Sequence, residues 1–189
     1  MPANRYHFQE QWHIPGHRPD EVYRVLHNAM LLPNWWSGVY LEVVPLRAYP
    51  CPMVGAKARA TARGFLPYTL TFELEARRLE LDRMVEVRTS GDFEGTWRAE
   101  LHAEPDGTKI EIDWRVTVDK PLIRWLSPLL RPLFSWNHRW TTPRGQQGLR
   151  AYLQRNRQGQ PIDVSRLFPA PNPAPSPALT VDPLPAVAA

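Results

Sequence analysis

The sequence predicts an α+β domain in which an antiparallel sheet of about seven strands wraps around a long C-terminal helix. Two observations lead to this prediction. Between residues 6 and 118, apolar and polar residues alternate in several short segments, as they do in strands with one buried face. Beyond residue 121 the period lengthens to that of a helix, and bulky residues recur on one helical face up to residue 157.

The alternating segments are joined mostly by short turns. The first expected strand covers residues 6–14 and places one carboxylate, Glu10, on its apolar face. Ser90-Gly91-Asp92 and Pro105-Asp106-Gly107 both predict tight turns. The other expected strands cover residues 39–47, 56–63, 68–75, 84–89, 93–102 and 110–118. The pattern predicts an antiparallel meander with a single buried side.

Two short helices are expected between the first and second strands. Pro19-Asp20-Glu21 opens a helix, because proline suits a first turn and acidic residues suit the positive end of the helix dipole. Pro33-Asn34 is expected to end it, and Trp35-Trp36 to close one end of the core.

The long helix contains prolines that predict its start and its shape. Ser127-Pro128 can serve as N-cap and first turn, so residues 121–126 would form a separate turn. Pro132 and Pro143 each remove a backbone hydrogen bond and are expected to kink the axis. Bent helices can follow a curved sheet, or leave a gap beneath the bend.

One expected strand has alanine at every apolar position. Ala56, Ala58, Ala60 and Ala62 alternate with polar residues in the segment 56–63. A face with so little bulk suits either the close approach of another element or a space left for a ligand.

The charge of the chain is modest overall but concentrated in one segment. The 189 residues carry 23 Lys and Arg against 19 Asp and Glu, a net charge of +4. Residues 121–157 hold seven arginines and no acid. We interpret Arg150, Arg155 and Arg157 as partners of the negative end of the helix dipole. The alternative is a face for acidic lipid or nucleic acid. Without a lysine cluster or a nucleic-acid motif, we expect no nucleic-acid partner and at most transient contact with a membrane surface.

The remaining composition predicts a single domain without metal or cofactor. One cysteine, Cys51, excludes an internal disulfide, and the six histidines show no metal-ligand spacing. No apolar stretch is long enough for a signal peptide or a membrane span, so we expect a cytoplasmic protein. Eight of the 21 prolines fall in residues 161–189. We therefore expect a ligand-binding domain at residues 1–158 and a disordered Pro-rich tail at 159–189. No feature predicts an oligomeric state.

The order of elements resembles a known superfamily. The residues that carry the resemblance are Pro19-Asp20-Glu21-Val22-Tyr23, Pro33-Asn34-Trp35-Trp36, Leu66-Pro67-Tyr68, Gly91-Asp92-Phe93-Glu94-Gly95 and Trp136-Asn137-His138. The chain resembles the helix-grip fold of the START and pollen-allergen (SRPBCC) superfamily, most of all its polyketide cyclase/dehydrase and lipid-transport branch. The resemblance implies a cavity for hydrophobic small molecules between sheet and helix. The fold alone does not decide among the functions found on it.

The candidate site residues are those expected to face this cavity. As ligand-binding residues we predict Trp36, Tyr68, Phe72, Arg88, Phe93, Trp97, Trp114, Phe134 and His138. His138 is either a core histidine or a ligand contact and proton donor. An inward Glu10 is either half of a structural ion pair, with Arg88 or Arg63 as partner, or a catalytic acid.

The leading hypothesis is binding or transport of a lipid, isoprenoid or aromatic polyketide, because the chain contains no standard catalytic motif. The alternative is a cyclase or dehydratase in which His138 and Glu10 donate and accept protons while Tyr68 or Arg88 holds a carbonyl. A third hypothesis is an interaction protein that docks through its basic helix and tail.

Overall fold

A computed structural model describes residues 5–64, 69–117 and 127–157, and for residues 127–139 and 157 it describes the helix without its side chains. Seven strands form one antiparallel sheet in the order β1-β7-β6-β5-β4-β3-β2. The strands are β1 (Arg5–Pro15), β2 (Tyr40–Pro45), β3 (Lys57–Arg63), β4 (Thr69–Glu80), β5 (Met84–Gly91), β6 (Glu94–Glu104) and β7 (Gly107–Thr117). The predicted seven-stranded antiparallel sheet is confirmed. Residues 121–126, Tyr68 and the predicted disordered tail at 159–189 lie outside the described residues.

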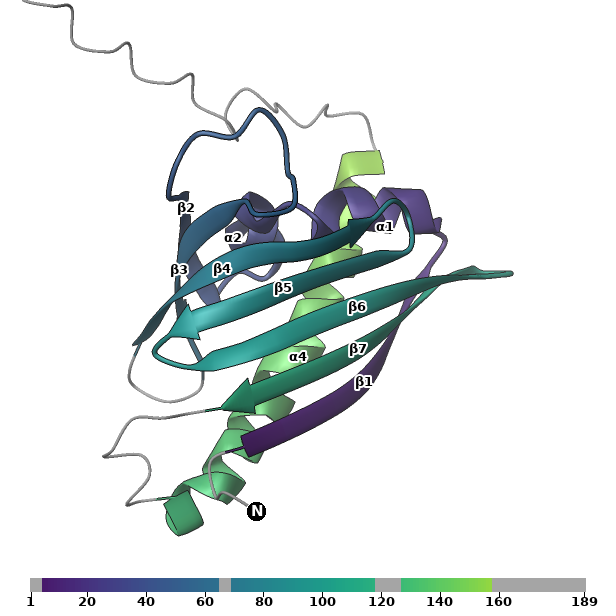
Figure 1. The fold of residues 1–189 in the computed structure, drawn as a ribbon. Coiled ribbons are helices and arrows are strands. Elements are labelled where there is room, and N and C mark those ends of the chain that lie inside the picture. Colours follow the sequence, from purple (N-terminus) through teal and green to yellow (C-terminus); the bar gives the residue numbers. More distant parts are fainter. Residues whose placement is uncertain (1–4, 65–68, 118–126, 158–189) are drawn as a thin grey trace, which may run out of the picture.

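The sheet curves around the C-terminal helix α4 (Ser127–Arg157), which crosses its concave face (Figure 1). The first and last strands pair along their whole length, from Arg5 opposite Thr117 to Pro15 opposite Gly107. This pairing places the N-terminal strand at one edge of the sheet and β2 at the other. The α+β helix-grip architecture predicted from the sequence is therefore the one observed.

The alternation of side chains decides which face is buried. In β7, the side chains of Ile110 and Ile112 are 0% and 5% exposed. Lys109 and Glu111, which alternate with them along the strand, form an ion pair with each other on the outer face. Successive side chains of a strand point to opposite faces, so every second residue reaches the helix side. The other strands of the meander follow the same rule, which is why the outer face carries charged side chains.

Three short helical segments connect β1 to β2. Helix α1 (Pro19–Leu26) begins where the Glu21 carboxylate accepts a 2.7 Å hydrogen bond from the Arg18 backbone N–H. It ends before Asn28, whose side chain accepts from the Met30 N–H and starts the 3-10 helix η1 (Ala29–Leu31). Helix α2 (Leu32–Trp35) follows directly, with Pro33 in its first turn. The prediction that Pro33 ends the first helix is wrong, because a proline in a first turn has no hydrogen bond to lose.

Helix α4 begins at Ser127, the residue predicted as its N-cap, and runs without interruption past Pro132 and Pro143. The kinks expected at these two prolines stay predictions. Its C-terminal half closes the main core against α1 and the ends of the strands. Leu149 is fully buried, and Tyr152 and Leu153 lie in the same cluster of apolar side chains. None of the helices in the described ranges is long and apolar enough to cross a membrane.

The arginines of α4 that the structure describes make local contacts. The Arg150 guanidinium donates to the His13 carbonyl of β1, with an Nε–O distance of 2.8 Å. The Arg144 guanidinium stacks over Trp140 at 3.8 Å from the ring centroid and donates to the Trp140 carbonyl. Arg155 donates to the Ala151 carbonyl one turn earlier. Arg150 thus ties the helix to the sheet, a contact that the helix-dipole interpretation did not include.

Candidate functional site: a cavity between sheet and helices

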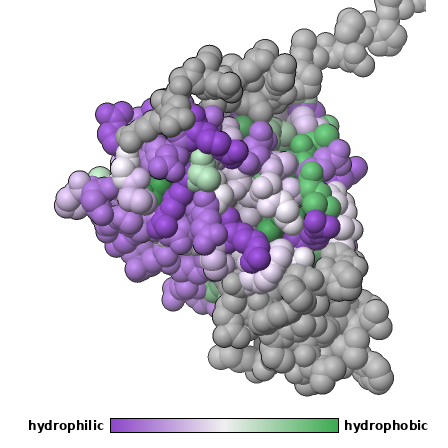
Figure 2. All heavy atoms as spheres, turned by 180° about the vertical axis from the view of Figure 1, so that it is seen from behind, coloured by the Kyte–Doolittle hydropathy of each residue, from purple (hydrophilic) through white to green (hydrophobic). Residues whose placement is uncertain are grey.

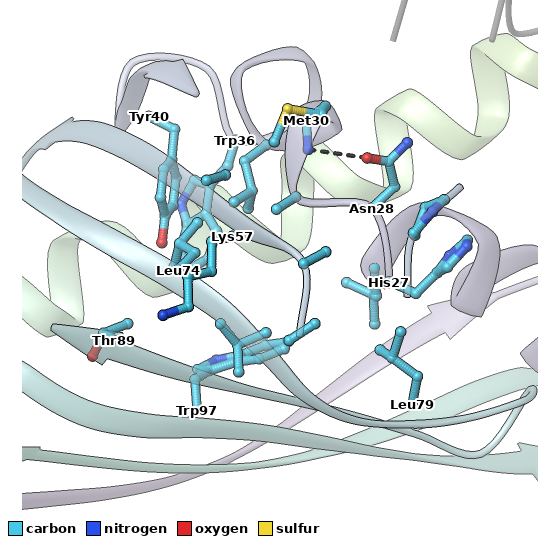
Figure 3. A pocket seen from close by; sticks show the side chains of 18 of the residues that line it. His27, Asn28, Met30, Trp36, Tyr40, Lys57, Leu74, Leu79, Thr89 and Trp97 are labelled. Carbon is cyan, nitrogen blue, oxygen red and sulfur yellow. Dashed lines mark hydrogen bonds between the residues drawn. The ribbon is translucent and has the colours of Figure 1, made fainter. Parts of the chain in front are cut away.

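A cavity of about 160 Å³ lies between the concave face of the sheet and the helices that cover it (Figure 3). A dry apolar cavity of about 150 Å³ is large enough to bind benzene. One aromatic ring therefore fits inside, and a longer molecule would extend toward the opening.

The sheet provides the floor of this cavity through its inward-facing side chains. Val87 and Thr89 of β5, Trp97 of β6 and Trp114 of β7 all line it. On β3 and next to it, the wall contains Ala58 and Ala56 together with Lys57, and the two small side chains leave room at this end. Of the two alternatives for the alanine-rich segment, a space left for a ligand agrees with the positions of Ala56 and Ala58.

The helical layer provides the roof. Trp36 lies between the ring of Trp12 at 5.7 Å and the ring of Tyr40 at 5.5 Å. Its Nε1 donates to the Thr141 carbonyl of α4 at 3.1 Å. Helix α4 comes this close because Gly145 has no side chain: a Cβ there would lie only 2.7 Å from the Trp36 ring. The indole is thus fixed between α2 and α4, with both Trp36 and Tyr40 facing the cavity.

The opening lies at the loop between β2 and β3, residues 46–56. Ala48, Cys51 and Met53 of this loop line the cavity and are also exposed to solvent. The loop is held by Tyr49, whose hydroxyl accepts from the Lys57 N–H at 3.0 Å. Figure 2 shows apolar side chains gathered along the edge of the molecule where β2 lies. The exposed large apolar residues on β2 and this loop are Leu41, Val44, Leu46, Met53 and Val54.

Glu10 is the acidic group of the cavity wall. Its carboxylate accepts hydrogen bonds from Thr142 Oγ1 at 2.9 Å and from Trp12 Nε1 at 3.0 Å. The predicted pairing with Arg88 or Arg63 is wrong for Arg88, which is exposed on the other face of β5. Arg63 is exposed as well, and its Nε lies 3.5 Å from the Gly38 carbonyl. Because α4 lies close to β1, Thr142 is a hydrogen-bond partner of Glu10. The sequence pattern does not contain this distance.

Two titratable side chains in the wall are shifted toward their neutral forms. Burial lowers the pKa of His27 from its ordinary value, although the hydrogen bond between its Nδ1 and the Tyr23 carbonyl acts in the opposite direction. Burial raises the pKa of Tyr40 to about 12. At neutral pH both are therefore uncharged, in keeping with a cavity for apolar molecules.

The predicted site residues fall into three groups. Trp36, Phe93, Trp97 and Trp114 line the cavity, as does Glu10. Within the described chain, Phe72 and Arg88 do not. Phe72 is 4% exposed and packs behind Phe93 at a ring distance of 4.6 Å, so it belongs to the core. The side chains of Tyr68, Phe134 and His138 lie outside the described residues.

Several residues of the wall were not predicted. They come from the junction between α1 and η1, from η1 itself and from the β2–β3 loop, whose positions over the sheet depend on the tertiary structure. The main ones are His27, Asn28, Met30, Tyr49 and Met53. Thr89 could have been found, because it continues the inward alternation of Val85 and Val87.

A separate cluster lies outside the cavity. His13, Glu104 and Asp106 place their ligand-type atoms within 4.8 Å of one another. Each ring nitrogen of His13 lies 3.1 Å from one of the two carboxylates. The histidine therefore bridges the two acids by hydrogen bonds, and these contacts account for the cluster.

Solved structures of other proteins share the fold of this chain over most of its length. Protein TTHA0849 of Thermus thermophilus has a TM-score of 0.67 and 15% identity over 80% of this chain and 99% of that one. The Zhui aromatase/cyclase of Streptomyces sp. R1128 has a TM-score of 0.66 and 10% identity over 80% and 95%. Ara h 8.0201 has a TM-score of 0.60 and 14% identity over 80% and 99%. At these identities the similarity shows the fold alone.

A search of curated proteins found no match. The family model described as polyketide cyclase/dehydrase and lipid transport matches residues 15–142. These residues include the short segments α1, η1 and α2, six of the seven strands and the part of α4 that contacts Glu10. The chain is thus a member of the polyketide cyclase/dehydrase and lipid-transport family, within the SRPBCC superfamily.

Proposed function

We propose that this protein binds or carries an apolar small molecule, such as a lipid, an isoprenoid or an aromatic polyketide, in the cavity between sheet and α4. The observation that supports this most is the wall itself. It is built mainly from aromatic and aliphatic side chains, it contains neutral forms of His27 and Tyr40, and it opens to solvent at the β2–β3 loop. Such a wall with few polar groups is typical of a ligand site.

Native mass spectrometry of freshly purified protein tests this proposal. We expect a mass above that of the 21.8 kDa chain, lost under denaturing conditions, and identified by extraction into organic solvent. In vitro, a neutral fluorescent probe such as N-phenyl-1-naphthylamine should bind with a rise in emission. Failure of the protein to carry any ligand and to bind the probe would contradict the proposal.

The second candidate is a cyclase or dehydratase in the same cavity. It is favoured by one observation, the Glu10 carboxylate in the wall, held by Thr142 and Trp12. A positioned carboxylate can act as a general base or acid. Incubation with a linear polyketide thioester, with product followed by mass spectrometry, tests it. Turnover that is lost in Glu10→Gln supports catalysis, whereas bound but unchanged substrate supports a carrier.

The cellular setting and the partners of the protein are part of the same proposal. We place the protein in the cytoplasm, with its apolar ligand as the main partner and without nucleic acid. Transient contact with a membrane surface would take place at the β2–β3 loop, where exposed apolar side chains such as Met53 and Val54 surround the opening. Sedimentation with anionic vesicles, with and without Val54→Ser, measures that contact.

A further inference from the structure

Two polar atoms in the wall of the cavity are buried without a hydrogen-bond partner among the described residues. They are Oγ1 of Thr89 and Nε1 of Trp35. The two residues are 4% and 3% exposed, and both line the cavity. Nearly all buried polar side chains in proteins have a partner, because an unpaired buried group loses its bonds to water without compensation. Such a group in a ligand cavity indicates a bond that a ligand completes.

Thr89 lies at a distinct place on the floor. It continues the inward row of Val85 and Val87 on β5, and its backbone pairs with Leu74 on one side and Gly95 on the other. A Cβ at Gly95 would lie 3.3 Å from Thr89 Oγ1 and would overlap the Arg115 carbonyl. Residue 95 therefore stays without a side chain, and this position of β6 leaves the hydroxyl uncovered. Figure 3 shows Thr89 at the end of the cavity opposite His27 and Leu79.

Three other polar residues of the wall, Glu10, Trp36 and Asn28, already have hydrogen-bond partners within the protein. The Glu10 carboxylate accepts from Thr142 and Trp12, the Trp36 indole donates to the Thr141 carbonyl, and the Asn28 carbonyl oxygen accepts from Met30. Against these, the Thr89 hydroxyl stands among apolar neighbours such as Leu74 and Trp97. A hydroxyl can donate to an oxygen acceptor, and an indole N–H can only donate. Both unpaired groups therefore suit an acceptor oxygen.

We propose that the Thr89 hydroxyl is the polar anchor of the cavity and donates a hydrogen bond to a carbonyl oxygen on an otherwise apolar ligand. This inference rests on the proposed function, since it requires that the cavity bind an apolar molecule. It adds a chemical class: neutral ketones and related carbonyl compounds bind better than hydrocarbons of the same shape. Trp35 Nε1 offers a second donor to the same class.

Two probes of matched shape separate the inference from the proposed function. 2-Acetylnaphthalene and 2-isopropenylnaphthalene differ in a carbonyl oxygen against a methylene group. Their affinities are measured by displacement of N-phenyl-1-naphthylamine from the wild-type protein, from Thr89→Val and from Thr96→Val. Thr96 lies on β6 opposite Arg88, on the outer face of the sheet, so its variant removes a hydroxyl without touching the cavity.

The wild-type protein and Thr96→Val should prefer the ketone. In Thr89→Val this preference should fall about fivefold, the effect of one ordinary hydrogen bond, while the hydrocarbon binds as before. An unchanged preference in Thr89→Val overturns the inference but leaves the proposed function intact. If the purified protein carries no ligand and binds neither N-phenyl-1-naphthylamine nor the two naphthalene probes, both the inference and the proposed function are overturned.

Thermal unfolding of the ligand-free proteins gives a second measurement. Removing an unpaired buried hydroxyl should raise the Tm of Thr89→Val by about 2–4 °C. A lower Tm would show that the hydroxyl has a partner within the protein, and would overturn the inference independently of any probe.

Discussion

Small residues have opposite effects in two regions of this interior. On α4, Gly145 and Gly148 bring the helix against Trp36 and Trp35, and no space is left between them. On β3, Ala58 also has a small side chain, yet it lines an open cavity. The difference lies in what approaches. The helix backbone occupies the space that a missing side chain leaves, whereas β3 is hydrogen-bonded to β2 on one side and β4 on the other and keeps its place in the sheet.

Two alanines of β3, Ala58 near its start and Ala60 at its centre, show how local this effect is. Ala60 is fully buried in a cluster with Phe72 and Leu74, while Ala58, two residues earlier on the same face, lies in the cavity wall. Packing density is therefore set by the elements above the strand and not by the strand itself.

The largest effect is expected at the closed contact. In Gly148→Ala, the new Cβ would overlap the Trp35 carbonyl oxygen, which belongs to the backbone and cannot rotate away. We expect a loss of about 3 kcal/mol in the free energy of unfolding, although helix propensity alone would predict a gain of about 1 kcal/mol. Urea denaturation measures it. Gln147→Ala, one residue earlier on the exposed side, should stay within about 0.5 kcal/mol. A stabilised Gly148→Ala protein would show that helix and α2 are not in contact.

The next largest effect is a difference in stability between leucine variants at Ala60 and at Ala58. Ala60→Leu should lose about 1–3 kcal/mol in unfolding free energy, because its surroundings are already filled. Ala58→Leu should leave stability within about 1 kcal/mol and weaken binding of N-phenyl-1-naphthylamine at least tenfold, because the added side chain occupies the cavity. Equal losses of stability in both variants would contradict the contrast between closed and open ends of β3.

A smaller effect is expected where β1 meets α4. Thr142→Val removes the hydroxyl that donates to Glu10 and should cost about 1 kcal/mol, with Thr142→Ser as the control that keeps the hydroxyl. Chemical denaturation of both variants measures the difference. If valine and serine behave alike, the contact does not contribute to closing this part of the interior.

The smallest effect concerns the roof near the opening. Because burial lowers the pKa of His27, the unfolded chain takes up this proton first as the pH falls. The stability due to neutral His27 is complete above its ordinary pKa of 6.5 and is lost as the pH falls through the lowered value. His27→Gln should therefore lose less Tm than the wild-type protein between pH 7 and pH 5. At pH 8, where the His27 ring is neutral in both the folded and the unfolded wild-type chain, the difference in Tm between the two proteins gives the packing contribution. Parallel Tm curves would place His27 in a solvated environment.

The comparison also indicates which parts of the site could be predicted. The inward positions of Trp97 and Trp114 follow from alternation along their strands, and Trp36 from its place after the Pro33 turn. The prediction that Arg88 lines the cavity is wrong, and alternation along β5 contains the reason: Val85, Val87 and Thr89 face inward, so Arg88 faces outward. Phe72 was assigned the correct face, but its burial behind Phe93 depends on a neighbouring hairpin.

The sequence by itself determined the seven strands, their inner and outer faces, the start of α4 and the family, because these depend on short-range periodicity, turn residues and caps. Only the tertiary structure decided where the interior is closed and where it is open. That outcome depends on distances between elements far apart in the chain, such as Gly148 against Trp35 and Thr142 against Glu10. The residue types give the size of each side chain, but they do not give the distance from that side chain to the helix or strand that faces it.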